Sequence, residues 1–247
     1  MDRRQLSTLA HQHHPIAAPL SEASVRRLLD RALPRGDERV LDLGCGEAGW
    51  LLRALSGRPL ARAEGVDLSP TALAAARDAV ARAGLRDRLL LHERDAAGFS
   101  APHPFDLVLD VGATHAFGGL TPALRAAHAH LAPQGRVLVG EGFWEREPDR
   151  AALDALDASA DDYDDLATTV ERVTADGWTP VYGHVSTPAE WDDYEWSWTG
   201  SLAEWALDHP DRPGSGTARE TAAAHRDGWL GGYRGTLGFV TLLLRRS

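Results

Sequence analysis

The chain has 247 residues and a formal net charge of −10, with 43% hydrophobic and 25% charged residues. This length suits one large α/β domain, and the composition is ordinary for a globular protein. The negative charge argues against nucleic acid or an anionic membrane as the main partner, and no apolar run approaches the ~20 residues of a membrane span. Cys45 is the only cysteine, so no intramolecular disulfide can form and we expect a reducing, cytoplasmic location.

The first twenty residues are polar and lack a clear period, so we expect an irregular segment there. His11, His13 and His14 lie close together, but no cysteine or carboxylate stands at ligand spacing, and we expect no metal site. Ser21 then starts a predicted helix whose apolar face ends before Pro34 and Gly36.

From residue 39 onward strands and helices alternate, which is typical of a parallel sheet with crossover helices. The expected strands are Arg39–Leu43, Ala61–Asp67, Arg88–Glu93, Phe105–Val111, Arg136–Gly140, Trp178–Val185 and Leu237–Leu244. The expected helices are Glu47–Ser56, Thr71–Ala83, Thr121–Leu131, Thr217–Tyr233 and an interrupted segment Pro148–Ala175, and Pro133–Gly135 is expected to be a turn. We predict one domain, with a core at about 36–145 and 177–247 and a cap formed by 1–35, 146–176 and 186–235.

The most informative stretch is the run Val40–Leu43 followed by Gly44-Cys45-Gly46 and then Gly49. It predicts a buried parallel strand that feeds a tight glycine turn, where a ligand can approach the backbone at the switch point of the sheet. Asp67 ends the second strand about twenty residues later, and a carboxylate there can accept both hydroxyls of a ribose. This spacing alone fits a nicotinamide cofactor equally well.

Two segments separate these alternatives, because Leu41–Gly46 and Gly65-Val66-Asp67-Leu68-Ser69-Pro70 resemble the first two motifs of class I S-adenosylmethionine (SAM)-dependent methyltransferases. The resemblance covers about Val40–Gly140. It implies a Rossmann-like three-layer α/β sandwich with a seven-stranded, mostly parallel sheet, an antiparallel last strand and SAM as cofactor. It also implies that Asp67 holds the ribose, Asp42 helps to place the amino group and Asp95 contacts adenine, unless Asp95 is an exposed turn residue. The full implied cofactor-binding set is Asp42, Gly44, Cys45, Gly46, Asp67, Leu68, Asp95, Ala96 and Asp110.

The loop after the fourth strand faces the transferable methyl group in this family, and His115 lies in it among small residues. His115 is therefore our candidate catalytic base and a substrate contact, the alternative being a histidine that caps the loop. Glu141 and Trp144 end the fifth strand and are further substrate-binding candidates. Trp191 and Tyr194 complete that set, because tryptophans interleaved with carboxylates suit a planar or cationic ligand. The aromatic stretch Pro188–Leu207 could equally be the core of the cap or a dimer contact.

The function predicted from these features is transfer of a methyl group from SAM to a nucleophilic oxygen or nitrogen, less readily carbon or sulfur, of a small molecule. We expect a monomer or homodimer with no nucleic acid or membrane partner. The alternatives are a nicotinamide-dependent oxidoreductase and a non-catalytic SAM-binding regulatory protein.

Overall fold

A seven-stranded sheet organises the part of the chain that the computed structural model describes, residue 1 and residues 3–246. Its strands follow the order β3-β2-β1-β4-β5-β7-β6, so the last strand is inserted between the two that precede it. The pairs β1–β2, β1–β4, β2–β3 and β4–β5 are parallel, and the predicted sheet with one antiparallel strand is confirmed. The strands are β1 (Arg39–Leu43), β2 (Arg62–Asp67), β3 (Leu89–Glu93), β4 (Phe105–Val111), β5 (Leu131–Trp144), β6 (Trp178–Val185) and β7 (Leu237–Arg246).

The central strands form the core because their sequences are almost continuously apolar. Val40 and Leu41 on β1 and Leu107, Val108 and Leu109 on β4 are all fully buried. Strands covered on both faces by helices require such runs rather than an alternating pattern. The pairing of Val40 with Leu107 and of Asp42 with Leu109 brings the ends of β1 and β4 to the same edge of the sheet.

The chain divides into two units, which we call the sheet unit and the cap unit and describe separately. The sheet unit comprises Ser21–Glu141, Val170–His184 and the chain from Val240 onward. The cap unit comprises Met1–Leu20, Gly142–Thr169 and Val185–Phe239. Residues 21–35, which we expected in the cap, thus lie in the sheet unit. The single-domain organisation stays a prediction.

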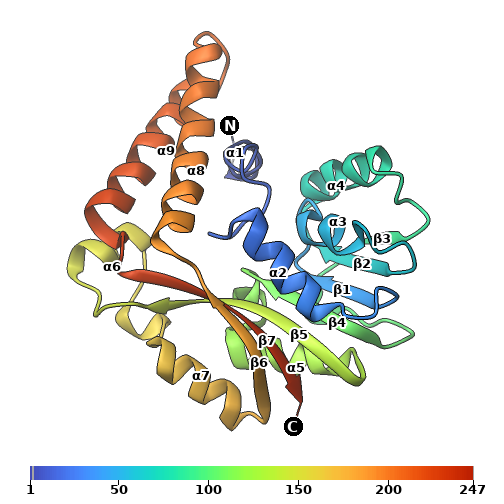
Figure 1. Ribbon diagram of the computed structural model, residues 1–247. Coiled ribbons are helices and arrows are strands. Elements are labelled where there is room, and N and C mark those ends of the chain that lie inside the picture. The colour runs from blue at the N-terminus through green and yellow to red at the C-terminus, as the bar shows by residue number, and fades with distance from the viewer. Residues whose placement is uncertain (2, 247) are drawn as a thin grey trace. The chain divides into compact units, whose positions relative to one another are not determined.

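Two of the four helices in the sheet unit begin at a serine N-cap, one of which, Ser21, the sequence predicts. The four helices are α2 (Glu22–Ala32), α3 (Gly49–Leu55), α4 (Pro70–Arg82) and α5 (Leu120–Ala129). The side chain of Ser21 accepts a hydrogen bond from the Ser24 N–H, and that of Ser69 accepts one from the Ala72 N–H. Figure 1 shows α2, α3 and α4 along one face of the sheet and α5 along the other. Right-handed crossovers explain this arrangement for α3, α4 and α5. The chain moves across the sheet from β1 to β3 through α3 and α4, and in the opposite direction from β4 to β5 through α5, so α5 covers the other face.

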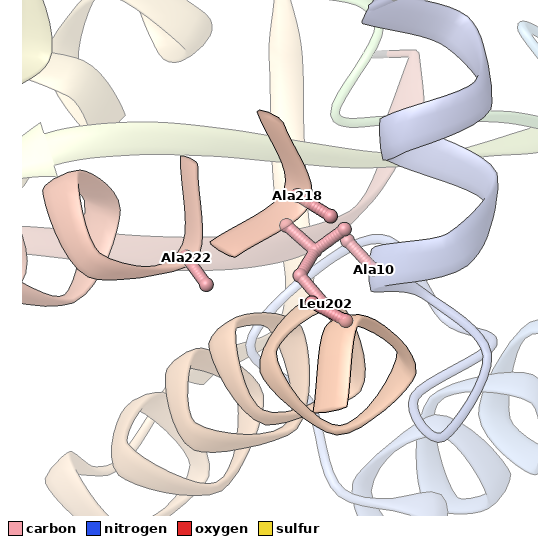
Figure 2. Packing of buried hydrophobic residues seen from close by; sticks show 5 residues of the cluster. Ala10, Leu202, Ala218 and Ala222 are labelled. Atoms are coloured by element: carbon pink, nitrogen blue, oxygen red, sulfur yellow. The ribbon is translucent and has the colours of Figure 1, made fainter. Parts of the chain in front are cut away.

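The cap unit is mostly helical. Its helices are α1 (Arg3–Ala10), α6 (Arg150–Leu156), the short 3₁₀ helix η3 (Ala160–Asp162), α8 (Pro188–Asp208), α9 (Ser215–Gly228) and the π-helical turn η4 (Trp229–Tyr233). The boundary between the two units falls within α7 (Leu166–Ala175). Helices α8 and α9 run side by side (Figure 1). Leu202 of α8 packs against Ala218 and Ala222 of α9 and Ala10 of α1, as Figure 2 shows. These small side chains let the helices approach closely.

Two expectations from the sequence are wrong. The N-terminal segment is not irregular throughout, because α1 forms there. Leu6, Leu9 and Ala10 of α1 pack on the α8–α9 core, and such tertiary contacts stabilise a short helix that is marginal in isolation. The expected turn at Pro133–Gly135 is instead an irregularity inside β5. Leu131 pairs with Phe105 and Arg136 pairs with Leu107, so extra residues of β5 lie unpaired between them, and Gln134 takes a φ of +65°. In the described part of the chain no helix is long and apolar enough to span a membrane.

Candidate cofactor site at the carboxyl edge of the sheet

The turn after β1 is built by two glycines with positive φ angles, +100° at Gly44 and +52° at Gly46. The backbone N–H groups of Gly44 and Cys45 both donate to the Val66 carbonyl at 2.9 Å, which ties the turn to β2. A Cβ atom at position 44 would lie 2.5 Å from the Cβ of Ala113, whereas one at position 46 would meet no atom within 4 Å. Gly44 therefore allows the loop after β4 to pack closely, and Gly46 leaves open space beside the backbone.

Asp67 at the end of β2 is held by two backbone donors. Its Oδ2 accepts from the Gly46 N–H at 2.8 Å, and its Oδ1 accepts from the Ser69 N–H at 2.7 Å. The side chain is half-buried. Each oxygen keeps a second acceptor position, so the fixed carboxylate can still receive two hydroxyl groups. Asp67 therefore connects the glycine turn to the start of α4.

Three acidic side chains gather at the ends of β1, β4 and β5. Asp42 is 3% exposed and Asp110 is 1% exposed, and Glu141 is half-buried. Among the described residues, both carboxylate oxygens of Asp110 and Oε2 of Glu141 are buried without a hydrogen-bond partner. Unpaired buried carboxylates are costly, so each requires a physical account.

The electrostatics of this acidic cluster favour proton or cation binding. Burial, then the charges of Asp110 and Asp67, raise the pKa of Asp42 well above its ordinary value. Burial, then the Glu141 carboxylate, raises the pKa of Asp110 to about 7, and the polar backbone at Ala113 lowers it by less. Burial also raises the pKa of Glu141, and the Thr114 side chain opposes this. A nearby positive charge would relieve all three effects.

The ends of β2 and β3 carry the remaining predicted cofactor residues. Leu68 is 62% exposed, and Asp95 is exposed while Ala96 is half-buried. Asp95 Oδ1 accepts from the Ala97 N–H at 3.0 Å and caps the short 3₁₀ helix η1 (Ala96–Gly98). The cap orients one oxygen and leaves the other for a ligand. The predicted roles of these residues stay predictions.

Cys45 and His115 have different environments. The Cys45 thiol is buried, and burial followed by the charges of Asp42 and Asp67 raises its pKa, so it stays protonated and is a poor nucleophile. A Cβ on Gly65 would lie 2.7 Å from its sulfur, so the thiol fills space against β2. His115 is exposed on the 3₁₀ helix η2 (Thr114–Phe117), on the loop that follows Asp110.

Trp144, Trp191 and Tyr194 all belong to the cap unit. The Trp144 indole N–H donates to the Ala160 carbonyl at 2.9 Å. The Tyr194 hydroxyl lies 3.2 Å from His11 Nε2, and the rings of Trp191 and Tyr194 meet edge to face at 6.4 Å. These contacts explain how the cap holds the three rings. Their role in binding a substrate stays a prediction.

Sequence reasoning missed several polar residues that the fold brings together. Thr114 is 6% exposed and its side chain interacts with that of Glu141. In the cap unit, Glu195 accepts from Tyr233 and His225, residues 38 and 30 positions away. No local spacing indicates such a network. The described residues contain no group of three or more side chains arranged to hold a metal ion.

The residues at this edge fit SAM better than a dinucleotide. SAM carries a positive ammonium group and a positive sulfonium, whereas a dinucleotide carries a negative pyrophosphate. The oxygens of Asp110 and Glu141 that lack a partner among the described residues, together with buried Asp42, would attract the cations and repel the pyrophosphate. The glycine turn leaves space at Gly46, and Asp67 supplies a fixed acceptor pair.

Comparison with known proteins agrees with this geometry. Residues 40–135, which contain the glycine turn, Asp67, Asp95 and Asp110, match the family model of a methyltransferase domain. This match supports a class I SAM-dependent methyltransferase, and it covers the segment that carries the glycine turn.

Relatives extend this likeness beyond the matched segment. The chain is 27% identical over 213 residues to the uncharacterized protein YjhP of Escherichia coli, covering 85% of this chain and 86% of YjhP. A SAM-dependent methyltransferase from Geobacter sulfurreducens, solved with S-adenosyl-L-homocysteine (SAH), shares the fold with a TM-score of 0.89 at 24% identity, over 98% of both chains. One from Thiobacillus denitrificans, also solved with SAH, has a TM-score of 0.88 at 23% identity, over 100% of this chain and 99% of the other.

Proposed function

We propose that this chain binds SAM at the glycine turn and transfers its methyl group to a nucleophilic oxygen or nitrogen of a small molecule. The observation that carries the proposal is the set of buried carboxylates beside the turn, two of which have oxygens without a partner among the described residues. A cationic cofactor supplies the charge that this set lacks. The SAH found in the Geobacter and Thiobacillus proteins supports the same cofactor class.

Each part of the site has a proposed role toward SAM. Asp67, already fixed by Gly46 and Ser69, would hold the ribose hydroxyls. Asp42 and Asp110 would balance the positive charge on the methionine part of SAM. Gly44 and Gly46 would let that part approach the backbone. Asp95 and Ala96 would contact adenine, beside the exposed side chain of Leu68.

SAM supplies an electrophilic methyl carbon on a positively charged sulfur. The protein then needs to orient the acceptor in line with that carbon, and positioning alone supplies much of the rate enhancement. Exposed His115, on the loop after β4, would take the proton released by a hydroxyl or amine acceptor. Glu141 would bind a polar or cationic group of the acceptor, helped by buried Thr114.

A small-molecule acceptor is favoured by charge. The net charge of −10 disfavours a polyanionic partner such as nucleic acid. We extend the proposal to a cytoplasmic enzyme that acts as a monomer or homodimer, with Trp144, Trp191 and Tyr194 as acceptor contacts from the cap.

Calorimetry with SAH on the Asp67→Asn variant tests the proposal. Asparagine keeps the size of the side chain but replaces one charged acceptor, so we expect SAH affinity to fall roughly 10- to 100-fold. Asp78→Asn is the matched control, because Asp78 is exposed on α4 of the same unit. Unchanged affinity in Asp67→Asn, with both variants folded, would reject the assigned site.

The same experiment separates the alternative functions. An oxidoreductase would bind NADH and not SAH. A non-catalytic regulatory protein would bind SAH but would not consume SAM with any hydroxyl or amine acceptor in a broad panel. The proposed enzyme binds SAH and forms it from SAM when the acceptor is present.

A further inference from the structure

A pocket of about 490 Å³ lies within the cap unit, and every residue that lines it belongs to that unit. Its wall combines the start of α8, the π-helical turn η4 and the segment after β5. Trp191, Trp229 and Tyr233 supply three aromatic side chains. A pocket of this size with an aromatic lining suits a small organic molecule.

The aromatic wall is fixed by a buried polar network. The Tyr233 hydroxyl donates to Glu195 Oε1 at 2.7 Å, and His225 Nε2 lies 2.7 Å from Glu195 Oε2. Trp229 is 1% exposed, and the Trp191 ring meets the Tyr233 ring edge to face at 6.4 Å. The network joins α8, α9 and η4, so the rings are held in place before any ligand arrives. π-Helical turns such as η4 are frequent at functional sites.

Two hydrogen-bond donors in the pocket wall are unused. Ser186 is 7% exposed, and its hydroxyl has no partner among the described residues. The same holds for the buried indole N–H of Trp191. The backbone N–H of Ser186 donates to the Phe239 carbonyl, so the side chain alone is unsatisfied. A tryptophan N–H can only donate, and a ligand that satisfies it must carry an acceptor atom.

Two arginines, Arg146 and Arg234, also line the pocket. Arg234 is neutralised by Asp192, to which it donates twice at 2.9 and 2.7 Å. Arg146 donates through Nε to the Gly235 carbonyl at 2.7 Å, and no carboxylate of the described chain pairs with it. Glu145 also lines the pocket, and its side chain is exposed. The guanidinium of Arg146 thus remains able to bind a carboxylate.

We propose that this cap pocket is a binding site for a planar aromatic carboxylate. The ring of Trp191, backed by the buried rings of Trp229 and Tyr233, contacts the aromatic body of the ligand. The donors of Ser186 and Trp191, with the cation of Arg146, receive its acceptor oxygens. None of its residues is among those assigned to SAM, and Trp191 is the residue that it shares with the proposed acceptor contacts.

Titration of the full-length chain with 2-naphthoate tests the site, with binding followed by calorimetry and by tryptophan fluorescence. We expect saturable binding at one site per chain and weaker binding of neutral 2-naphthamide. Arg146→Met should weaken naphthoate roughly tenfold and change naphthamide less, because only the carboxylate interacts with the charge. Ser186→Ala and Trp191→Phe, which each remove one donor, should weaken both probes. Arg226→Met is the matched control and should leave both affinities unchanged, because the Arg226 side chain is 44% exposed on α9 and does not line the pocket.

Two results would overturn the proposal. One is the absence of saturable naphthoate binding to the folded wild-type chain at millimolar concentration. The other is equal binding by wild type and Arg146→Met, with circular dichroism showing both folded. Asp67→Asn should bind naphthoate as the wild type does, and its failure to do so would place the probe at the SAM site instead. Because these titrations contain no SAM, they succeed or fail independently of the proposed function.

Discussion

Replacing Asp110 with asparagine should change how the stability of the protein depends on pH. Asp110 is 1% exposed, and burial followed by the Glu141 charge raises its pKa from 3.8 to about 7. Ionising it in the folded protein therefore costs roughly 4 kcal/mol more than in the unfolded chain. Asparagine has nearly the same shape and carries no charge at any of these pH values, so it removes this cost.

The sign follows from where the proton is bound. Below pH 3.8 the Asp110 carboxyl is protonated in both states, and its contribution is neutral. As the pH rises toward 7, the unfolded chain has lost this proton while the folded chain still holds it, so the folded state loses about 1.4 kcal/mol per pH unit relative to the unfolded one. Above about pH 7 both states are ionised, and the loss levels off.

Urea unfolding of wild type and Asp110→Asn between pH 4.5 and 8.5 measures this effect. We expect the unfolding free energy of Asp110→Asn minus that of wild type to grow by a few kcal/mol up to about pH 7 and then to stay constant. Taking the difference removes the titration of groups that both proteins share, apart from those coupled to Asp110 such as Asp42 and Glu141. Parallel pH profiles for the two proteins would refute the buried, unpaired state of Asp110.

Two further substitutions test the turn and the loop that faces it. Gly44→Ala should abolish SAH binding measured by calorimetry and destabilise the fold by roughly 1–3 kcal/mol, because a Cβ there lies 2.5 Å from that of Ala113 on a backbone with φ +100°. Gly36→Ala, at φ +79° with open space around it, should lose less stability and keep SAH affinity, and equal effects of the two would contradict the close packing. His115→Ala should lower kcat with an identified acceptor while SAH affinity stays the same, since the exposed imidazole is proposed to act on the acceptor. If His115→Ala has the same kcat as the wild type between pH 6 and 9, His115 does not act as the base.

The strands of the sheet could be predicted from the sequence, because their apolar runs match their buried positions in the fold. Phe105–Val111 and Trp178–Val185 are strands with the bounds expected from their composition. The start of β5 was missed because Pro133-Gln134-Gly135 is a turn sequence that the sheet accommodates as a bulge. Helix α1 was missed because it is stabilised by α8 and α9, which lie far away in the chain.

The candidate cofactor site was predictable for a similar reason, since parallel strands bring their carboxyl ends to one edge. Asp42 and Asp110 occupy those ends, and the sequence alone places them together. The sequence does not reveal that Asp67 also anchors the glycine turn, or that neither carboxylate oxygen of Asp110 has a hydrogen-bond partner in the described part of the chain. Those facts depend on atomic positions. The Glu195 network and the cap pocket depend on helix packing across tens of residues, for which no short pattern exists.

The acidic cluster lowers the stability of the protein with an empty site and favours the binding of a cation. Asp42, Asp110 and Glu141 all have raised pKa values, so at neutral pH the empty site either holds protons or carries unfavourable charge. A cationic cofactor that enters it would replace those protons, so its binding should release protons near neutral pH and weaken as the pH falls. The same three side chains could be made neutral and the fold would gain stability. Their presence at the switch point of the sheet is therefore best explained by the charge of the ligand they would bind.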